Sequence, residues 1–372
     1  MRWLLLPFLS AVAPAQTVWT VPGMFRQIHQ ALAVAQPGDV IEVANGNYQP
    51  FAVTQGVTIR GTGTAVSVAL GSPVTFDVPA GQQAYAFQIQ LYSGAQVLRG
   101  SAAFERCRFD GPTAALEVDT AGQAVLVQSF ATASLGRQHG ALVRGHLAAV
   151  NSTFDGSLSW VAQGGHGLVV DGGSVQLAQC RLRGGGAVLP AHPASDGLLV
   201  LAGHAWLSDC DVQGGTSQVS ASGVGVHNQT TTPVLATRTN VSGGSGTPPG
   251  SAVLGPYSGT APLLGIWPLG NGLARGTNAA LGPRGPVGMP VFAYFGLRAE
   301  VVSHPALAAP AWLDSTLHLL DAGVLDATGN ALFPIAIPNL PWVRDVRLFF
   351  QVYGVDVQGQ VQATPPIASL VQ

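Results

Sequence analysis

A repeat of 21 to 30 residues runs through the middle of the chain and limits its fold more than any other feature. Each copy carries an apolar residue that is followed two positions later by glycine in all but the second copy. The apolar residues are Phe109, Phe130, Phe154, Leu182, Val212 and Val241. Two positions before them stand Cys107, Gln128, Ser152, Cys180, Cys210 and Thr239. One small, mostly weakly polar side chain per copy predicts a ladder of stacked units.

A second column of the repeat starts with a polar residue followed by glycine and a short apolar strand. Its members begin at His139, His166, Asp196 and Ser222. Further short strands lie between the two columns, and no helical period of 3.6 residues is present. A single coil of this kind cannot bury its apolar face, so neighbouring coils must stack. The sequence therefore predicts an all-β fold, a β-solenoid.

The residues that precede the first coil have a different pattern. Phe25, Ile28, Leu32 and Ala35 follow helical spacing and predict an amphipathic helix of about three turns. A helix here would cover the open end of the solenoid, whose unpaired strand edge would otherwise invite aggregation.

The helix is followed by PGDVIEVANGNY and then GVTIRGTG. This opening resembles that of right-handed parallel β-helix proteins of the pectin-lyase-like superfamily, over roughly residues 17–245. The resemblance implies a right-handed parallel β-helix for residues 16–245 with an N-terminal capping helix. It implies no single activity, because the superfamily includes lyases, hydrolases, esterases, epimerases and non-catalytic surface proteins.

The repeat ends in a segment rich in glycine and proline, for which we expect a linker over residues 246–258. Regular strand patterns over residues 259–372 then predict a small antiparallel β-sandwich. The run DATGNALFPIAIPNLPWVRDVRLFFQVYGVD is similar to a C-terminal module attached to many exported bacterial proteins. The resemblance implies an accessory or surface-association domain.

Residues 1–15 have the pattern of a secretory signal peptide, with Arg2 before a short apolar run and a small-residue cleavage site. We therefore expect a secreted or cell-surface protein with no membrane span. The chain has no lysine and a net charge of −2, which argues against a nucleic-acid partner.

The column His139, His166 and Asp196 is the candidate catalytic site. On stacked parallel coils, equivalent residues lie about 4.8 Å apart, so two imidazoles and a carboxylate could share a proton. Gly165-His166-Gly167 also resembles the Gly-His-Gly motif of polygalacturonase-type glycosidases. The partner motifs of that family, an Asn-Thr-Asp, an Asp pair and an Arg-x-Lys, are absent. The alternative interpretation is a stack of polar residues at a corner of the coil.

Three residues at strand ends, Arg144, Asp171 and His227, are candidates for substrate binding, together with the aromatic Trp160. No cofactor is expected. Calcium is left open, because the calcium-dependent pectate lyases cluster several aspartates, and Asp171, Asp196, Asp209 and Asp211 are close in this sequence.

Two functions follow from these patterns. The first is a non-catalytic surface or extracellular protein that binds polysaccharide or another cell-surface component. The second is a polysaccharide lyase or glycoside hydrolase that acts on an acidic glycan through the His139, His166 and Asp196 column. Charged residues make up 9% of the chain and its arginines are scattered, which favours the first. Cys180 and Cys210 lie one coil apart, and the strand geometry favours free thiols.

Overall fold

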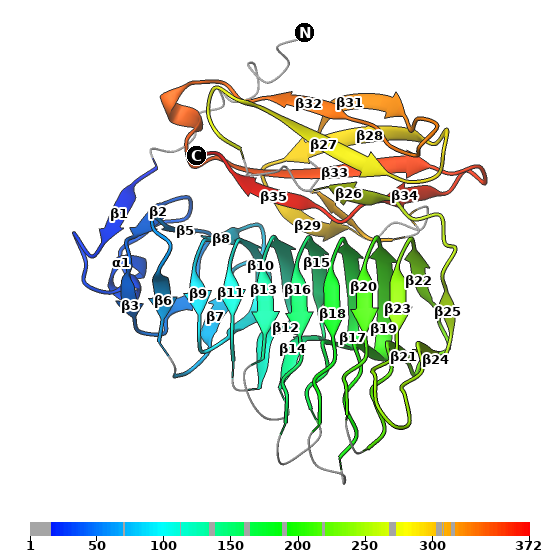
Figure 1. Cartoon of the computed structure of the whole chain (residues 1–372). Helices are drawn as coiled ribbons and strands as arrows, with labels where there is room; N and C mark the ends of the chain where they lie inside the picture. Colours follow the sequence, from blue (N-terminus) through cyan, green and yellow to red (C-terminus); the bar gives the residue numbers. More distant parts are fainter. Residues whose placement is uncertain are drawn as a thin grey trace.

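The computed structural model describes residues 16–69, 71–111, 113–133, 138–159, 164–187, 192–217, 220–267, 273–302, 307, 309–313 and 317–372. The expected signal peptide, residues 1–15, lies outside this part of the chain. The fold is all-β, with 53% strand and 2% helix, as predicted. A long body of parallel sheets is followed by a separate antiparallel region (Figure 1).

Parallel strands stacked coil on coil form two long sheets. The larger sheet has sixteen strands, which are β1 (Val18–Val21), β2 (Val40–Val43), β4 (Ala52–Val53), β5 (Thr58–Gly61), β7 (Val74–Asp77), β8 (Gln83–Phe87), β10 (Ala95–Glu105), β12 (Ala114–Val127), β14 (His139–Val143), β15 (His146–Val150), β17 (Leu168–Ala178), β19 (Leu198–Ser208), β21 (Val226–Asn228), β22 (Val234–Thr237), β24 (Val253–Leu254) and β25 (Tyr257–Ser258). The smaller has nine, which are β3 (Gly46–Tyr48), β6 (Val66–Val68), β9 (Gln90–Leu91), β11 (Arg108–Phe109), β13 (Phe130–Thr132), β16 (Thr153–Asp155), β18 (Arg181–Arg183), β20 (Asp211–Gln213) and β23 (Asn240–Ser242).

The helix α1 (Ile28–Leu32) lies at the N-terminal end of the solenoid, where a capping helix is expected (Figure 1). It is shorter than the predicted three turns, because a turn at Gln36-Pro37-Gly38-Asp39 follows closely. Ile28 and Ala31 are fully buried against the first coils. At the other end, β24 and β25 lie within residues 246–258 and pair in parallel with β21 and β22. The parallel ladder therefore extends to Ser258.

The strand register corrects the predicted core column at one copy. Phe109 pairs with Ala131, and Ala131 pairs with Phe154. Ala131 therefore occupies the buried place that the repeat assigned to Phe130, and Phe130 points outward. Because strand side chains alternate between faces, this slip of one residue exchanges a core position for a surface position.

The same register corrects the weakly polar column, in which Ser129 replaces Gln128. Ser129 Oγ accepts a hydrogen bond from the Cys107 amide at 3.1 Å, and Ser152 Oγ accepts one from the Ser129 amide at 3.2 Å. Cys107, Cys180 and Cys210 are free and buried, as expected. Burial raises the pKa of the Cys107 thiol to about 12. These side chains are therefore structural rungs at one corner of the coil.

Residues just before these rungs turn the corner in the left-handed backbone conformation. They are Gln88, Arg106, Gln128, Asn151, Gln179, Asp209 and Arg238, whose φ angles lie between 47° and 56°. One backbone shape is thus repeated at seven coils with several different side chains.

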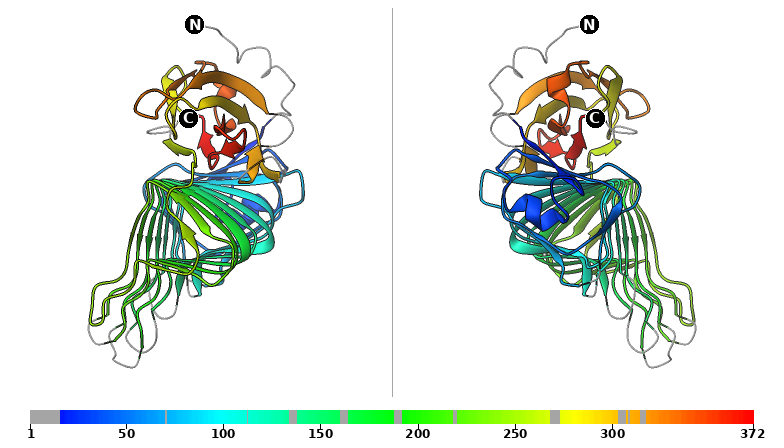
Figure 2. Two further views of the ribbon diagram at one scale, coloured as in Figure 1. Left: turned by 90° about the vertical axis from the view of Figure 1, so that its right-hand side faces the viewer. Right: turned by 90° about the vertical axis from the view of Figure 1, so that its left-hand side faces the viewer.

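A glycine-rich ledge projects from the later coils (Figure 2). Its described outgoing segments are residues 156–159, 184–187, 214–217 and 243–246, and its returning segments are residues 164–167, 194–197, 222–225 and 250–252. Amides of one segment donate to carbonyls of the segment in the other layer, for example Gly165 to Ser157 at 3.0 Å and Gly185 to Gly165 at 2.7 Å. The chain of bonds continues to Gly250. Two backbone layers thus contact each other directly.

We expect Gly184→Ala to destabilise the protein by about 1–3 kcal/mol. A methyl group at this glycine would collide with backbone atoms of Ser195 and Gly215, which cannot move without breaking the hydrogen bonds between the layers. Thermal or urea unfolding would measure the loss. Gly282→Ala is the matched control, because its methyl group would meet only ordinary contacts with Trp267. Equal stability of the two variants would contradict the close approach of the layers.

In its described residues, the C-terminal region forms three antiparallel sheets. Their strands are β26 (Gly265–Trp267), β27 (Asn278–Arg284) and β32 (Phe333–Ala336); β28 (Pro290–Gly296), β31 (His318–Val324), β33 (Arg347–Val355), β34 (Val361–Ala363) and β35 (Ile367–Leu370); and β29 (Ala299–Val302) with β30 (Ala311–Leu313). This region lies along one side of the solenoid (Figure 1).

A hydrophobic cluster joins the outer face of the sixteen-stranded sheet to the C-terminal region, separately from the core inside the solenoid. Outward-facing side chains of the sixteen-stranded sheet, such as Tyr85 and Val125, pack in the same cluster as Phe349 and Ile367. At the centre of this interface, the buried Glu105 carboxylate accepts hydrogen bonds from the Tyr85 hydroxyl at 2.5 Å and the Leu370 amide at 3.0 Å.

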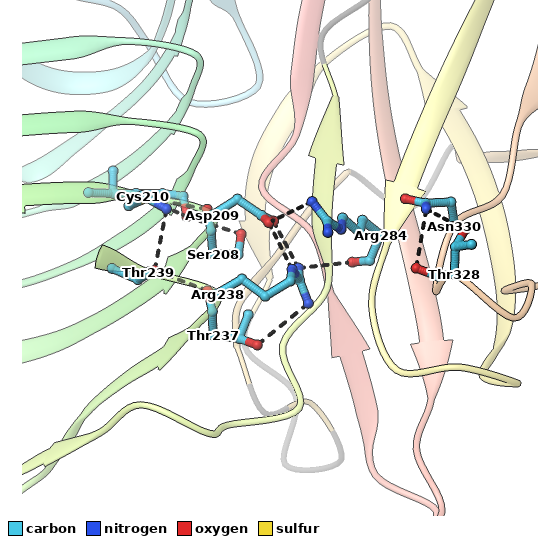
Figure 3. Close-up of polar contacts among 10 residues, drawn as sticks. Ser208, Asp209, Cys210, Thr237, Arg238, Thr239, Arg284, Thr328 and Asn330 are labelled. Atoms are coloured by element: carbon cyan, nitrogen blue, oxygen red, sulfur yellow. Dashed lines mark hydrogen bonds and ion pairs between the residues drawn. The ribbon is translucent and has the colours of Figure 1, made fainter. Parts of the chain in front are cut away.

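Ion pairs join the two parts at both ends of this interface. Near the N-terminal end, Arg60 contacts Asp345 of the C-terminal region. Near the other end, Asp209 forms a two-point ion pair with Arg238, with both N–O distances at 2.8 Å (Figure 3). Arg284 of β27 approaches the same carboxylate at 3.5 Å. The C-terminal region is therefore held along the length of the solenoid by apolar and charged contacts.

Candidate functional site

The predicted column of His139, His166 and Asp196 is present. The pairing of Ala141 with Leu168, and of Leu168 with Leu198, puts these three residues in register on successive coils. They lie where the returning layer of the ledge enters β14, β17 and β19. The next member is Val224 rather than Ser222, because Leu198 pairs with Val226.

Hydrogen bonds fix the state of the two imidazoles. Nδ1 of His139 accepts the backbone amide of His166 at 3.1 Å, and Nδ1 of His166 accepts the backbone amide of Asp196 at 3.0 Å. Because Nδ1 accepts, the proton of each neutral ring is on Nε2. The two rings are stacked with their centroids 5.3 Å apart. Each histidine therefore caps the backbone of the next coil.

Burial disfavours the charged form of both rings. It lowers the pKa of His139 from 6.5 to about 4, and the neighbouring His166 acts in the same direction. Burial also lowers the pKa of His166, with a smaller contribution from His227, against the opposite influence of the Asp196 carboxylate. A general base needs a free lone pair and a pKa near the working pH. Neither ring meets both requirements.

Asp196 ends this series of hydrogen bonds. Its Oδ1 accepts the Val224 amide at 2.8 Å, and its Oδ2 lies 3.0 Å from Nδ1 of His227. The structure thus brings His227 to the column, although it belongs to the neighbouring row that pairs with Leu199. Both oxygens of the carboxylate are engaged, which leaves Asp196 in a positioning role.

The other candidates lie elsewhere. Arg144 and Asp171 lie together at a different corner, with the Arg144 Nε 3.6 Å from the carboxylate and its Nη1 2.6 Å from Glu117. Asp171 is five residues, or about 16 Å, along the strand from His166. Trp160 is outside the described residues.

The aspartates that could suggest calcium are not gathered at one place. Asp209 pairs with Arg238, and Asp211 contacts Asn240 and Arg181 on the nine-stranded sheet. In the part of the chain that the structure describes, no group of three or more His, Cys, Asp or Glu side chains is arranged to hold a metal ion.

The sequence pattern did not predict the outer face of the nine-stranded sheet as a candidate surface. Phe130 is 52% exposed there, in an otherwise polar row of side chains. The one available signal was that the copy at Phe130 lacks the following glycine. A shift of the alignment by one residue would have placed Ala131 in the core.

Comparisons with known proteins do not identify a family for this chain. No protein-family model matches the chain, and a search of curated proteins finds no match. Within the described residues, no helix is long and apolar enough to cross a membrane.

Proposed function

We propose that this protein is an exported, non-catalytic β-helix of the pectin-lyase-like type that binds polysaccharide. The observation that carries the proposal is the hydrogen bonding of the His139, His166 and Asp196 column. Both Nδ1 atoms and both carboxylate oxygens are engaged in holding successive coils together. A solenoid whose best acid–base candidates serve as backbone caps is better suited to display a surface than to perform chemistry.

The distribution of charge supports the same function. Acidic glycans are usually cleaved in clefts lined by many cations, and this chain has 16 cationic residues in 372. Several of them are occupied in ion pairs, among them Arg60, Arg144 and Arg238. Export rests on the signal-peptide pattern of residues 1–15, and membership of the superfamily rests on the resemblance of residues 17–245.

We expect no product when the protein is incubated with neutral and acidic polysaccharides, with calcium or with a chelator. The measurements are the release of reducing ends and of unsaturated uronates, and the same glycans are tested for binding by affinity electrophoresis. His166→Gln is the control variant, since its amide oxygen can still accept the Asp196 amide. Product that forms with the wild type and disappears in His166→Gln would contradict the proposal and identify the column as catalytic.

A further inference from the structure

The outer face of the nine-stranded sheet carries two rows of side chains that run parallel to the solenoid axis. Phe109, Phe154 and Leu182 point into the core, so the residues on either side of them point outward. The first row contains Gln90, Arg108, Phe130, Thr153, Arg181, Asp211 and Asn240. The second contains Tyr92, Asp110, Thr132, Asp155, Arg183, Gln213 and Ser242.

This face is open. The sheet runs across the front of the solenoid in Figure 1, whereas the C-terminal region lies along a different side. Arg108, Phe130 and Asn240 are exposed. The first row therefore has exposed side chains along its length, most of the second row is half-buried, and together the two rows form a long polar strip.

Two aromatic side chains stand on this strip without a role in the core. Tyr92 is 37% exposed and Phe130 is 52% exposed. The Tyr92 hydroxyl donates to Gln90 at 2.7 Å, which fixes the ring on the surface. The two aromatics are separated by two coils, which is about 10 Å along the axis. That distance is roughly the length of two sugar rings in an extended glycan.

Several polar atoms of the second row have no hydrogen-bond partner among the described residues. They are buried, and they include Oδ1 of Asp110, Oδ1 of Asp155 and Nε of Arg183. Asp155 and Arg183 are paired residues on neighbouring strands. Because buried polar atoms are usually paired, often with ordered water, we expect water molecules at these atoms, through which the second row can hydrogen-bond to hydroxyl groups.

The charges on the strip balance. It contains three arginines (Arg108, Arg181, Arg183) and three aspartates (Asp110, Asp155, Asp211). An acidic polymer would meet as many repulsive as attractive groups, and so would a basic one. A neutral polymer with many hydroxyl groups meets no such penalty.

We propose that a neutral polysaccharide chain lies along this strip, stacks its rings on Tyr92 and Phe130, and hydrogen-bonds to the polar side chains between and beyond them. This inference rests on the proposed polysaccharide-binding function and assigns it a surface and a ligand class. The repeat of the coils and the repeat of the polymer then run in the same direction, so that successive sugars meet successive coils.

The test is affinity electrophoresis of the full chain against neutral glycans (a mixed-linkage β-glucan, xyloglucan, galactomannan and dextran) and acidic ones (polygalacturonate and alginate). We expect a neutral glycan to retard the wild type, and the double variant Tyr92→Ala/Phe130→Ala to bind it about tenfold or more weakly. Both side chains are exposed, so the melting temperature of the variant should match that of the wild type. Trp267→Ala is the matched control, since Trp267 is an exposed aromatic on the C-terminal region.

Different failures have different meanings. If the wild type binds and the double variant binds equally well, the assignment of the strip is wrong while the polysaccharide-binding function stands. The same holds if Trp267→Ala alone abolishes binding. Binding of acidic glycans only would overturn the ligand class. If the wild type binds none of these polysaccharides, both the assignment and the proposed function fail.

Discussion

A chain that ends at Ser258 should be insoluble or should associate into oligomers, even though it contains every coil of the solenoid. Removal of the C-terminal region would expose the outer apolar face of the sixteen-stranded sheet, which is buried in the full chain. That face consists of Tyr85, Phe87, Ala103, Val125, Val127, Ala148, Val150 and Ala178. Each large side chain would lose about 2 kcal/mol of burial. An exposed apolar patch of this size promotes association.

The experiment compares residues 16–258 with residues 16–372 by soluble yield and by sedimentation velocity. Glu105 would also lose the Leu370 amide and would be exposed to water together with the apolar face around it. Co-expression of residues 259–372 with the short chain is the control, and it should restore solubility. A monodisperse short chain with wild-type stability would mean that the interface contributes little.

The protein should lose stability as the pH falls from 6.5 to about 4. His139 has a pKa of about 4 in the folded state, against about 6.5 in an unfolded chain. Above pH 6.5 the ring is neutral in both states and the full stability is present. Below it, the unfolded chain binds a proton that the folded state cannot accept until about pH 4. The total loss from this residue is about 3 kcal/mol. The lowered pKa of His166 acts in the same direction.

Urea unfolding at pH 7.0 and at pH 4.5 would measure this loss. In His139→Gln the side chain no longer titrates and can still accept the His166 amide, so its stability should depend less on pH. His204→Gln is a control, because His204 is an exposed histidine on another row of the solenoid. If His139→Gln keeps the wild-type pH dependence, a different group causes the acid effect.

The sequence predicted the fold because repetition is visible in residue types alone. Copies of the same buried position carry Phe109, Phe154, Leu182 and Val212. The structure pairs the last three in order on stacked strands, with Ala131 between Phe109 and Phe154. The second copy was assigned one residue too early. A large apolar side chain is usually assigned to the core. Because Ala131 is also apolar, the sequence pattern does not show which of the two residues is buried.

The position of the C-terminal region was not predicted, although the sequence contained a signal for it. Strands such as β8 and β15 are apolar at consecutive positions, as in Ala84-Tyr85-Ala86-Phe87 and Leu147-Ala148-Ala149-Val150. A strand that faces water on one side alternates apolar and polar residues, whereas a strand covered on both sides does not. Consecutive apolar residues in the coils therefore indicate a second layer, but they do not say which segment supplies it.

The spacing of the candidate site could be predicted from the sequence, whereas the hydrogen bonds of its side chains could not. Repeat lengths alone place His139, His166 and Asp196 on one column. Whether an imidazole Nδ1 is a free base or an acceptor for a backbone amide depends on a rotamer and on a distance of about 3 Å. Such details follow from the packed backbone around the ring.

The glycine-rich ledge has a consequence for how this protein can diverge. Main-chain hydrogen bonds run between its two layers, so this contact does not depend on the identity of most outward side chains. We expect substitutions at the exposed Thr216 and Ser245 to be tolerated with loss of one surface hydrogen bond, whereas a Cβ at Gly184 or Gly215 would collide with backbone atoms. Related chains should therefore share the spacing of their glycines long after overall identity has faded, and that spacing is the feature by which distant relatives of this ledge would be recognised.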